Sequence, residues 1–233
     1  MEYSIDDLKN RLQRLLESIE YHASKAGRKT DEIKLVAVSK THPIEAIKIA
    51  YELGLKRFGE NYAQELREKV NLANQFQLDI EWHFVGRIQT NKVKYIVPAC
   101  ELIHSVWRVE ELEEINKVAE KYGKIQKVLI EVHTSPEESK AGVDLEDVGE
   151  LVEKAQKFTH IKVVGLMTMA PFIEPERTRP YFRKLYELRE RLRNKYPEIV
   201  ELSMGMTNDY WVAIEEGSTI IRIGTAIFGE RRT

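Results

Sequence analysis

A lysine ends one of the most apolar runs of the chain. Residues 34–40 read KLVAVSK, in which residues typical of a buried strand lead directly to Lys40. Because side chains alternate across a strand, Val36, Val38 and Lys40 share one face. A lysine removed from water loses its proton more easily, and its amine can then attack a carbonyl to form a Schiff base. An equal alternative stays open, in which the side chain reaches solvent or pairs with a carboxylate such as Glu60.

Two segments near the end of the sequence have the composition of an anion-binding site. SMGMTNDYW contains Gly205, which permits close backbone approach, and Thr207, which precedes a helix expected from about Asn208. RIGTAIFG supplies Gly224 and Thr225 in a glycine-containing turn. Taken singly, Thr207 is explained by helix capping and Gly224 by a tight turn. Together, after the last two strands, they indicate a phosphate site.

Arg222 adds a positive charge close to this turn. It alternates with Ile220 and Gly224, so it is expected to point inward near the end of its strand. There it can serve as a structural ion-pair partner, or it can face the ring nitrogen of a heteroaromatic cofactor. Lysine, phosphate turn and inward arginine together favour pyridoxal 5′-phosphate (PLP).

The elements that must position these residues form a regular pattern. Ser4 opens an amphipathic helix, and apolar runs of strand type then alternate with helical segments. Near-continuous apolar strands indicate a parallel sheet covered on both faces. We therefore expect a single-domain (β/α)8 TIM barrel over residues 1–233 with an additional N-terminal helix. Its strands are predicted at 34–40, 56–61, 82–86, 102–106, 127–133, 163–169, 200–205 and 218–224. Barrel enzymes place their sites at the carboxyl ends of such strands.

Composition excludes several classes of protein. The 36 basic and 38 acidic residues nearly cancel, which argues against nucleic acid or anionic membrane as partners. The single cysteine, Cys100, excludes an intramolecular disulfide, and six scattered histidines show no metal-ligand spacing. His83 is best explained as a packed or hydrogen-bonded histidine, and His104 has no visible carboxylate partner. Without a signal core or a long apolar run, the chain is expected to be cytoplasmic.

Seven motifs occur in order along the chain: AVSKTHP, FGENYAQE, WHFVGRIQTNK, SKAGV, GLMTM, LSMGMTND and GSTIIRIGTAIFGER. Through these motifs the sequence resembles the YggS/PROSC family of pyridoxal phosphate homeostasis proteins, from about residue 4 to the C-terminus. The resemblance implies a barrel like the N-terminal domain of bacterial alanine racemase. It also implies a role in buffering PLP inside the cell and transferring it to apo-enzymes.

The resemblance assigns roles to individual residues. It implies that Lys40 carries PLP as a Schiff base and that Asn61 lies beside the cofactor. Arg222 would face the pyridine nitrogen, and the phosphate would be held by Thr207, Gly224 and Thr225. Thr207 replaces a serine that is common in the family; it keeps the hydroxyl and adds a methyl group.

Two further residues have simpler explanations than a ligand role. Barrel packing is the first explanation for Met167, which we nevertheless include among the cofactor-binding residues because it can line the pocket. Lys140 can touch the mouth of the site, although a solvated loop lysine is the default.

Two enzymatic alternatives remain beside the carrier. A PLP-dependent amino-acid racemase of this type would need a second domain, and the sequence ends at Thr233, soon after the last strand, so none is expected. A monomer is expected as well, because the racemase-type dimer needs that second domain. An arginine at the pyridine nitrogen also weakens the ring as an electron sink. A cofactor-free Schiff-base aldolase would leave the glycine turn and Arg222 without a role unless its substrate were phosphorylated. The carrier is therefore favoured.

Overall fold

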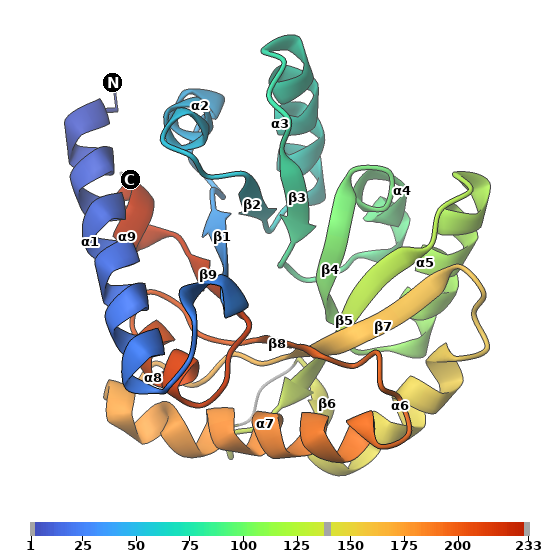
Figure 1. The fold of residues 1–233 in the computed structure, drawn as a ribbon. Helices are drawn as coiled ribbons and strands as arrows, with labels where there is room; N and C mark the ends of the chain where they lie inside the picture. Colours follow the sequence, from blue (N-terminus) through green and yellow to red (C-terminus); the bar gives the residue numbers. More distant parts are fainter. Residues whose placement is uncertain (1–2, 138–140, 231–233) are drawn as a thin grey trace.

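The apolar runs of the sequence form one closed parallel sheet. The computed structural model describes residues 3–137 and 141–230 (Figure 1). Its sheet order is β4-β3-β2-β1-β9-β8-β7-β5-β6, and pairing of β4 with β5 closes the barrel. The barrel strands are β1 (Lys34–Val38), β2 (Arg57–Glu60), β3 (Glu81–Phe84), β4 (Cys100–Val106), β5 (Gln126–His133), β7 (Ile161–Met167), β8 (Glu201–Ser203) and β9 (Ile220–Ile223). A short strand, β6 (Val143–Asp144), pairs with β5 outside the ring. The predicted barrel is confirmed.

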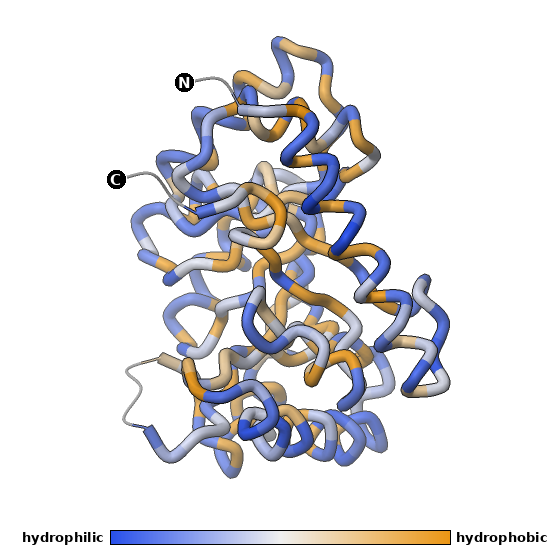
Figure 2. The backbone as a smooth tube through the Cα atoms, turned by 90° about the vertical axis from the view of Figure 1, so that its left-hand side faces the viewer, coloured by the Kyte–Doolittle hydropathy of each residue, from blue (hydrophilic) through white to orange (hydrophobic). Residues whose placement is uncertain are grey.

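Helices surround the barrel and cover its outer face (Figure 1). The tube of these helices alternates between hydrophilic and hydrophobic colours in Figure 2, as expected when one face of each helix is buried. The helices are α1 (Ile5–Lys25), α2 (Ile44–Glu52), α3 (Ala63–Gln75), α4 (Val93–Ile96), α5 (Val109–Lys121), α6 (Val148–Ala155), α7 (Arg179–Arg193), α8 (Tyr210–Glu215) and α9 (Thr225–Phe228). Within the described ranges, none is both long enough and apolar enough to cross a bilayer.

The additional N-terminal helix, α1, supports the C-terminal part of the barrel. The Ser4 hydroxyl accepts a hydrogen bond from the Asp7 backbone N–H, which starts the helix as the sequence predicts. From the helix, Arg11 Nε donates to the Ile227 carbonyl of α9 over 2.8 Å. Figure 1 shows α1 beside α9 and α8, so the first and last helices of the chain are packed together.

Strand alternation divides the core into two layers. The inner layer fills the barrel, and the outer layer lies between the strands and the helices. Val36 belongs to the inner layer and Ala37 to the outer one, so β1 has the orientation predicted from the sequence. The inner apolar layer consists of Val36, Leu102, Leu129, Val164, Met167 and Ile220. It forms a floor beneath the carboxyl ends of the strands.

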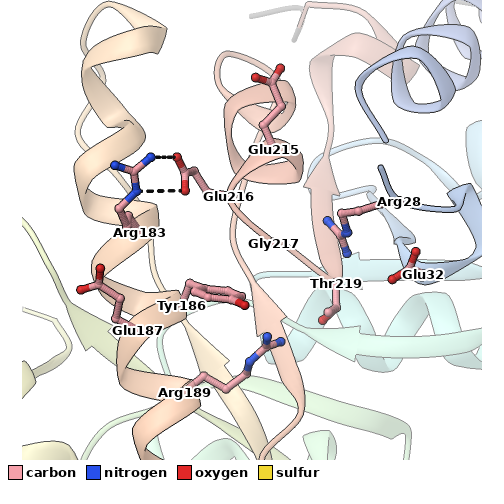
Figure 3. A pocket seen from close by; sticks show the side chains of 10 residues that line it. All are labelled: Arg28, Glu32, Arg183, Tyr186, Glu187, Arg189, Glu215, Glu216, Gly217 and Thr219. Atoms are coloured by element: carbon pink, nitrogen blue, oxygen red, sulfur yellow. Dashed lines mark hydrogen bonds and ion pairs between the residues drawn. The ribbon is translucent and has the colours of Figure 1, made fainter. Parts of the chain in front are cut away.

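A polar hollow lies near the amino ends of β1 and β9, remote from the predicted site (Figure 3). Several arginines line it, and each has protein partners. Arg183 Nη2 donates to Glu216 Oε1 over 2.6 Å, and Arg28 Nη1 donates to the Ile214 carbonyl over 2.8 Å. Because these cations are already bonded within the fold, we interpret the hollow as part of the contact between α7 and the barrel.

Candidate functional site

A cleft of about 190 Å³ opens at the carboxyl ends of the barrel strands. The ends of β1, β2, β3, β7, β8 and β9 and the segments that follow them contribute its walls. The residues that line it are Val38, Lys40, His42, Asn61, Val85, Met169, Met206, Thr207, Asn208, Arg222, Gly224 and Thr225. Six predicted cofactor-binding residues therefore meet at one place: Lys40, Asn61, Thr207, Arg222, Gly224 and Thr225.

The remaining predicted cofactor-binding residue, Met167, does not line the cleft. Met167 is the last residue of β7, is fully buried and belongs to the apolar floor of the barrel. Met169, two residues further on, has 51% of its surface exposed and lines the cleft. Direct contact between Met167 and a cofactor stays a prediction. Lys140 lies outside the described residues.

Lys40 lies in the short loop after β1, and Lys69 binds the backbone of this loop. β1 ends at Val38, and Thr41 has the left-handed φ of 67° that is uncommon for a threonine. Lys69, on α3, donates from Nζ to the Ser39 carbonyl over 2.7 Å. The residue immediately before Lys40 is thereby fixed to a neighbouring helix.

Two carboxylates complete this arrangement, which we call the Lys69 clamp (Lys69, Glu60 and Glu65). Lys69 Nζ lies 2.7 Å from Glu60 Oε1 and 2.6 Å from Glu65 Oε1. Glu65 Oε1 also accepts a hydrogen bond from the Thr41 N–H at 2.5 Å. The clamp therefore binds the backbone on both sides of Lys40.

Glu60 is the buried anion of the clamp. Its side chain is inaccessible to solvent and accepts a 2.6 Å hydrogen bond from the Ser39 hydroxyl. Burial raises the pKa of Glu60 to about 7, and the neighbouring Lys69 ammonium opposes that rise. The alternative in which Glu60 serves as the partner of Lys40 is therefore not favoured, since Lys69 and Ser39 hold this carboxylate.

Asn61 brings an unpaired polar atom to the cleft. Its buried side-chain Oδ1 has no hydrogen-bond partner among the residues that the structure describes. A Cβ added to Gly86 would overlap the Asn61 carbonyl oxygen, so glycine is required for the close approach of these segments. An unsatisfied buried acceptor beside a cleft is the feature expected where a ligand supplies the missing donor.

Arg222 is the cation at the floor of the cleft. It is buried, and its guanidinium donates to Ser203 Oγ over 2.6 Å and to the Thr168 carbonyl over 3.1 Å. Burial lowers the pKa of Arg222 to about 10, while the charges of Asp209 and Glu131 act in the opposite direction. The side chain therefore remains a cation and a hydrogen-bond donor at neutral pH.

Thr207 does not cap the helix that follows it, so that interpretation of the sequence is wrong. The helix α8 begins at Tyr210, and Asp209 Oδ1 accepts the Met206 N–H over 2.8 Å in the preceding turn. Thr207 Oγ1 instead accepts a 3.3 Å hydrogen bond from the Ala226 N–H in α9. The hydroxyl thus joins the loops after β8 and β9.

Gly224 occupies the tight junction between β9 and α9. It is the N-cap residue of α9, and an added Cβ would lie 3.2 Å from the Val38 carbonyl oxygen. Glycine therefore allows the end of β9 to pass close to the end of β1. Gly205, with φ 105°, allows a similar approach to α8, since its Cβ would lie 2.8 Å from the Ala213 side chain.

Glu131, which the sequence analysis did not single out, is a buried acid on β5 near Arg222. Burial raises the pKa of Glu131 to about 7, and the Arg222 charge opposes that rise. Between about pH 4.5 and 7 the folded state holds the proton more tightly than the unfolded chain, so stability falls as the pH rises through this window.

We expect Glu131→Gln to remove this part of the pH dependence. Relative to wild type, the variant should gain roughly 2–3 kcal/mol in the free energy of unfolding between pH 5 and pH 8. Urea denaturation at the two pH values measures the difference. A wild-type-minus-variant difference that does not change with pH would contradict the assignment.

The residues present fit a phosphorylated aromatic aldehyde. The cleft combines an amine, a buried unpaired oxygen, a cation and a threonine hydroxyl beside a helix start. This geometry on a parallel barrel defines the alanine-racemase class of barrel protein. The family model described as alanine racemase, N-terminal domain, matches residues 12–232.

Comparison with individual relatives defines the family of the chain more narrowly. It is 50% identical over 224 residues to the pyridoxal phosphate homeostasis protein of Aquifex aeolicus, covering 95% of this chain and 97% of that one. It is 35% identical to the corresponding Escherichia coli protein, covering 97% and 98%. The solved structure of PipY from Synechococcus elongatus with PLP bound is 32% identical, with a TM-score of 0.82 and coverage of 95% and 100%. The chain belongs to the YggS/PROSC family of pyridoxal phosphate homeostasis proteins.

Proposed function

We propose that this protein binds PLP through a Schiff base on Lys40 and takes part in PLP homeostasis by buffering and transferring the cofactor. The observation that carries the proposal is the convergence of Lys40, Arg222 and Thr207 on one cleft. The PLP-bound structure of PipY, whose sequence is 32% identical, supports the choice of ligand.

Each wall of the cleft has a role in this proposal. Lys40 would hold the cofactor through its amine, since a lysine amine can condense reversibly with an aldehyde and release water. Thr207, Gly224 and Thr225 hold the phosphate at the junction of the loops after β8 and β9. Asn61 supplies an acceptor beside the ring.

Arg222 influences which reactions the bound cofactor can support. A guanidinium that stays protonated would donate to the pyridine nitrogen and so leave that nitrogen without a proton. PLP supplies an electron sink when its ring nitrogen is protonated, and this cation weakens that function. The arrangement favours holding the cofactor over the decarboxylation or transamination of amino acids.

The cellular setting is part of the same proposal. A near-neutral charge and a single buried cysteine fit a monomer that works in the cytoplasm. The partners would be PLP-dependent apo-enzymes that receive the cofactor. The alternative is a PLP-dependent amino-acid racemase.

Reconstitution of the purified protein separates these functions. We expect a yellow absorbance after addition of PLP, and recovery of activity when the loaded protein is mixed with a PLP-dependent apo-enzyme. Incubation of the loaded protein with single L-amino acids should give no D-enantiomer above a PLP-only control. A protein that stays colourless would refute PLP binding, and substantial racemisation would replace the carrier with the enzyme.

A further inference from the structure

A line of polar side chains crosses the barrel interior from the cleft to the opposite mouth. Arg222 Nη1 lies 2.6 Å from Ser203 Oγ, which lies 2.8 Å from His104 Nδ1. His104 Nε2 is 2.8 Å from His83 Nδ1, and His83 Nε2 is 3.0 Å from Glu81 Oε1. We call Ser203, His104, His83 and Glu81 the interior chain. Four consecutive hydrogen bonds thus connect Arg222 to the other end of the barrel.

The interior chain is buried except at its far end. Ser203, His104 and His83 are almost inaccessible to solvent, and they come from β8, β4 and β3. Only the Glu81 side chain, 38% exposed, reaches a surface hollow at the amino ends of the strands. Polar groups at such depth are expensive unless every one is hydrogen-bonded, and here each ring nitrogen has a partner.

When each histidine ring carries a single proton, the groups at the two ends fix the direction of every bond. The Arg222 guanidinium only donates, so Ser203 Oγ accepts and its proton is directed to His104 Nδ1. A neutral His104 then carries its proton on Nε2 and donates to His83 Nδ1. His83 in turn carries its proton on Nε2 and donates to the Glu81 carboxylate, which only accepts. All four bonds point away from the cleft.

The charges around the interior chain support this pattern. Burial lowers the pKa of His104 well below its usual range, and the nearby Arg222 charge acts in the same direction. His104 is therefore neutral and has a single ring N–H. Hydrogen bonding to His83 lowers the pKa of Glu81, with support from the Arg57 and Lys34 charges, so Glu81 is a carboxylate. The other charged groups that act on Arg222 are Glu131 on β5 and Asp209 before α8.

We propose that the interior chain positions Arg222 at the cofactor, with its direction set by the Glu81 carboxylate at the opposite mouth. The inference rests on the proposed function for its ligand. The Arg222 guanidinium donates one hydrogen bond to Ser203 Oγ and one to the Thr168 carbonyl. These two bonds restrict its orientation, so that it would face the ring nitrogen. If the Glu81 acceptor is removed, both histidines can change tautomer together, and His104 Nδ1 then no longer accepts the Ser203 proton.

The first test needs no cofactor. Long-range 15N–1H NMR of the PLP-free protein reports which ring nitrogen of each histidine carries the proton. The proposed direction requires a proton on Nε2 of both His83 and His104 and none on Nδ1 of either ring. A proton on Nδ1 of either ring, or a charged ring, would overturn the proposal. Because the wild-type protein is used, this result does not depend on whether a variant folds.

The second test changes the far end of the interior chain. Glu81→Leu should leave attachment of PLP to Lys40 intact, shift the absorbance maximum of the bound form and speed PLP release about threefold. Glu101, an exposed neighbour at the same hollow, supplies the matched control Glu101→Leu, which should change neither property. Unchanged spectra and release rates in Glu81→Leu would overturn the proposal.

A third variant cuts the interior chain beside Arg222. Ser203→Ala should give the same spectral shift with about tenfold faster release. Ser105→Ala removes another buried serine hydroxyl, one that donates to the Gly86 carbonyl, and should leave the spectrum unchanged. Equal spectra for Ser203→Ala and wild type would count against positioning. If wild type fails to bind PLP, the proposed function fails, while the NMR result still decides the state of the interior chain.

Discussion

Replacement of Lys40 by alanine is expected to abolish covalent binding of PLP. Lys40 and Val38 both line the cleft, and in the proposed function the Lys40 amine attacks the aldehyde. Non-covalent contacts from Arg222 and Thr207 would remain, so weak binding should persist with an affinity lower by about 100-fold or more. Absorbance titration with PLP measures both the yellow band and the affinity.

A matched control keeps this result specific. Lys92 lies on the rim of a neighbouring hollow, and Lys92→Ala should retain the yellow band. Lys40→Ala should also unfold at nearly the same urea concentration as wild type. A variant that kept the yellow band would show that another amine carries the aldehyde, and the account of the cleft would then be wrong.

Lys69→Met should have the largest effect on stability. At a pH above the raised pKa of Glu60, it would leave this carboxylate buried without its cation, and breaking a buried pair in this way costs about 3–5 kcal/mol. It also removes the donor to the Ser39 carbonyl, so the loop that carries Lys40 loses a support. We therefore expect a lower free energy of unfolding in urea together with weaker binding of PLP.

A double variant identifies the cause of that loss. Glu60→Gln added to Lys69→Met removes the uncompensated charge, so the double variant should be more stable than Lys69→Met alone. The exposed Lys9 on α1 supplies the control Lys9→Met, with a change within about 0.5 kcal/mol. A double variant less stable than the single one would contradict a buried ion pair in the Lys69 clamp.

The barrel and most of the cleft follow from local patterns in the sequence. Apolar runs predicted the barrel strands, and alternation in KLVAVSK predicted that Lys40 follows the inward face of β1. The same reasoning placed Arg222 in the interior. These predictions succeeded because strand periodicity is a property of neighbouring residues, and barrel closure brings all the strand ends to one mouth.

The clamp could not be predicted, because its sequence signal has another usual meaning. Glu65 and Lys69 are four residues apart on a helix, which is typical of an exposed pair. Only the packing of α3 on the ends of β1 and β2 buries Lys69 against Glu60. Similarly, Thr207 was expected to cap α8, but the bond to Ala226 depends on where α9 lies.

The interior chain could not be predicted either, because its contacts also join segments that are far apart in the sequence. The sequence favoured a packed or hydrogen-bonded His83, and the structure confirms this. His104 had no visible partner because Ser203, which its ring contacts, lies 99 residues further along the chain. Contacts across a closed barrel depend on strand order and register, which no short stretch of sequence contains.

Reduction of the PLP-loaded protein with borohydride, followed by peptide mapping, tests the central claim most directly. Borohydride converts a Schiff base into a stable secondary amine, so the modified lysine keeps its label through digestion. We predict one pyridoxyl group, on the peptide that contains Lys40. A label on any other lysine, or no label on a protein that binds PLP, would contradict the assignment of Lys40 as the residue that holds the cofactor.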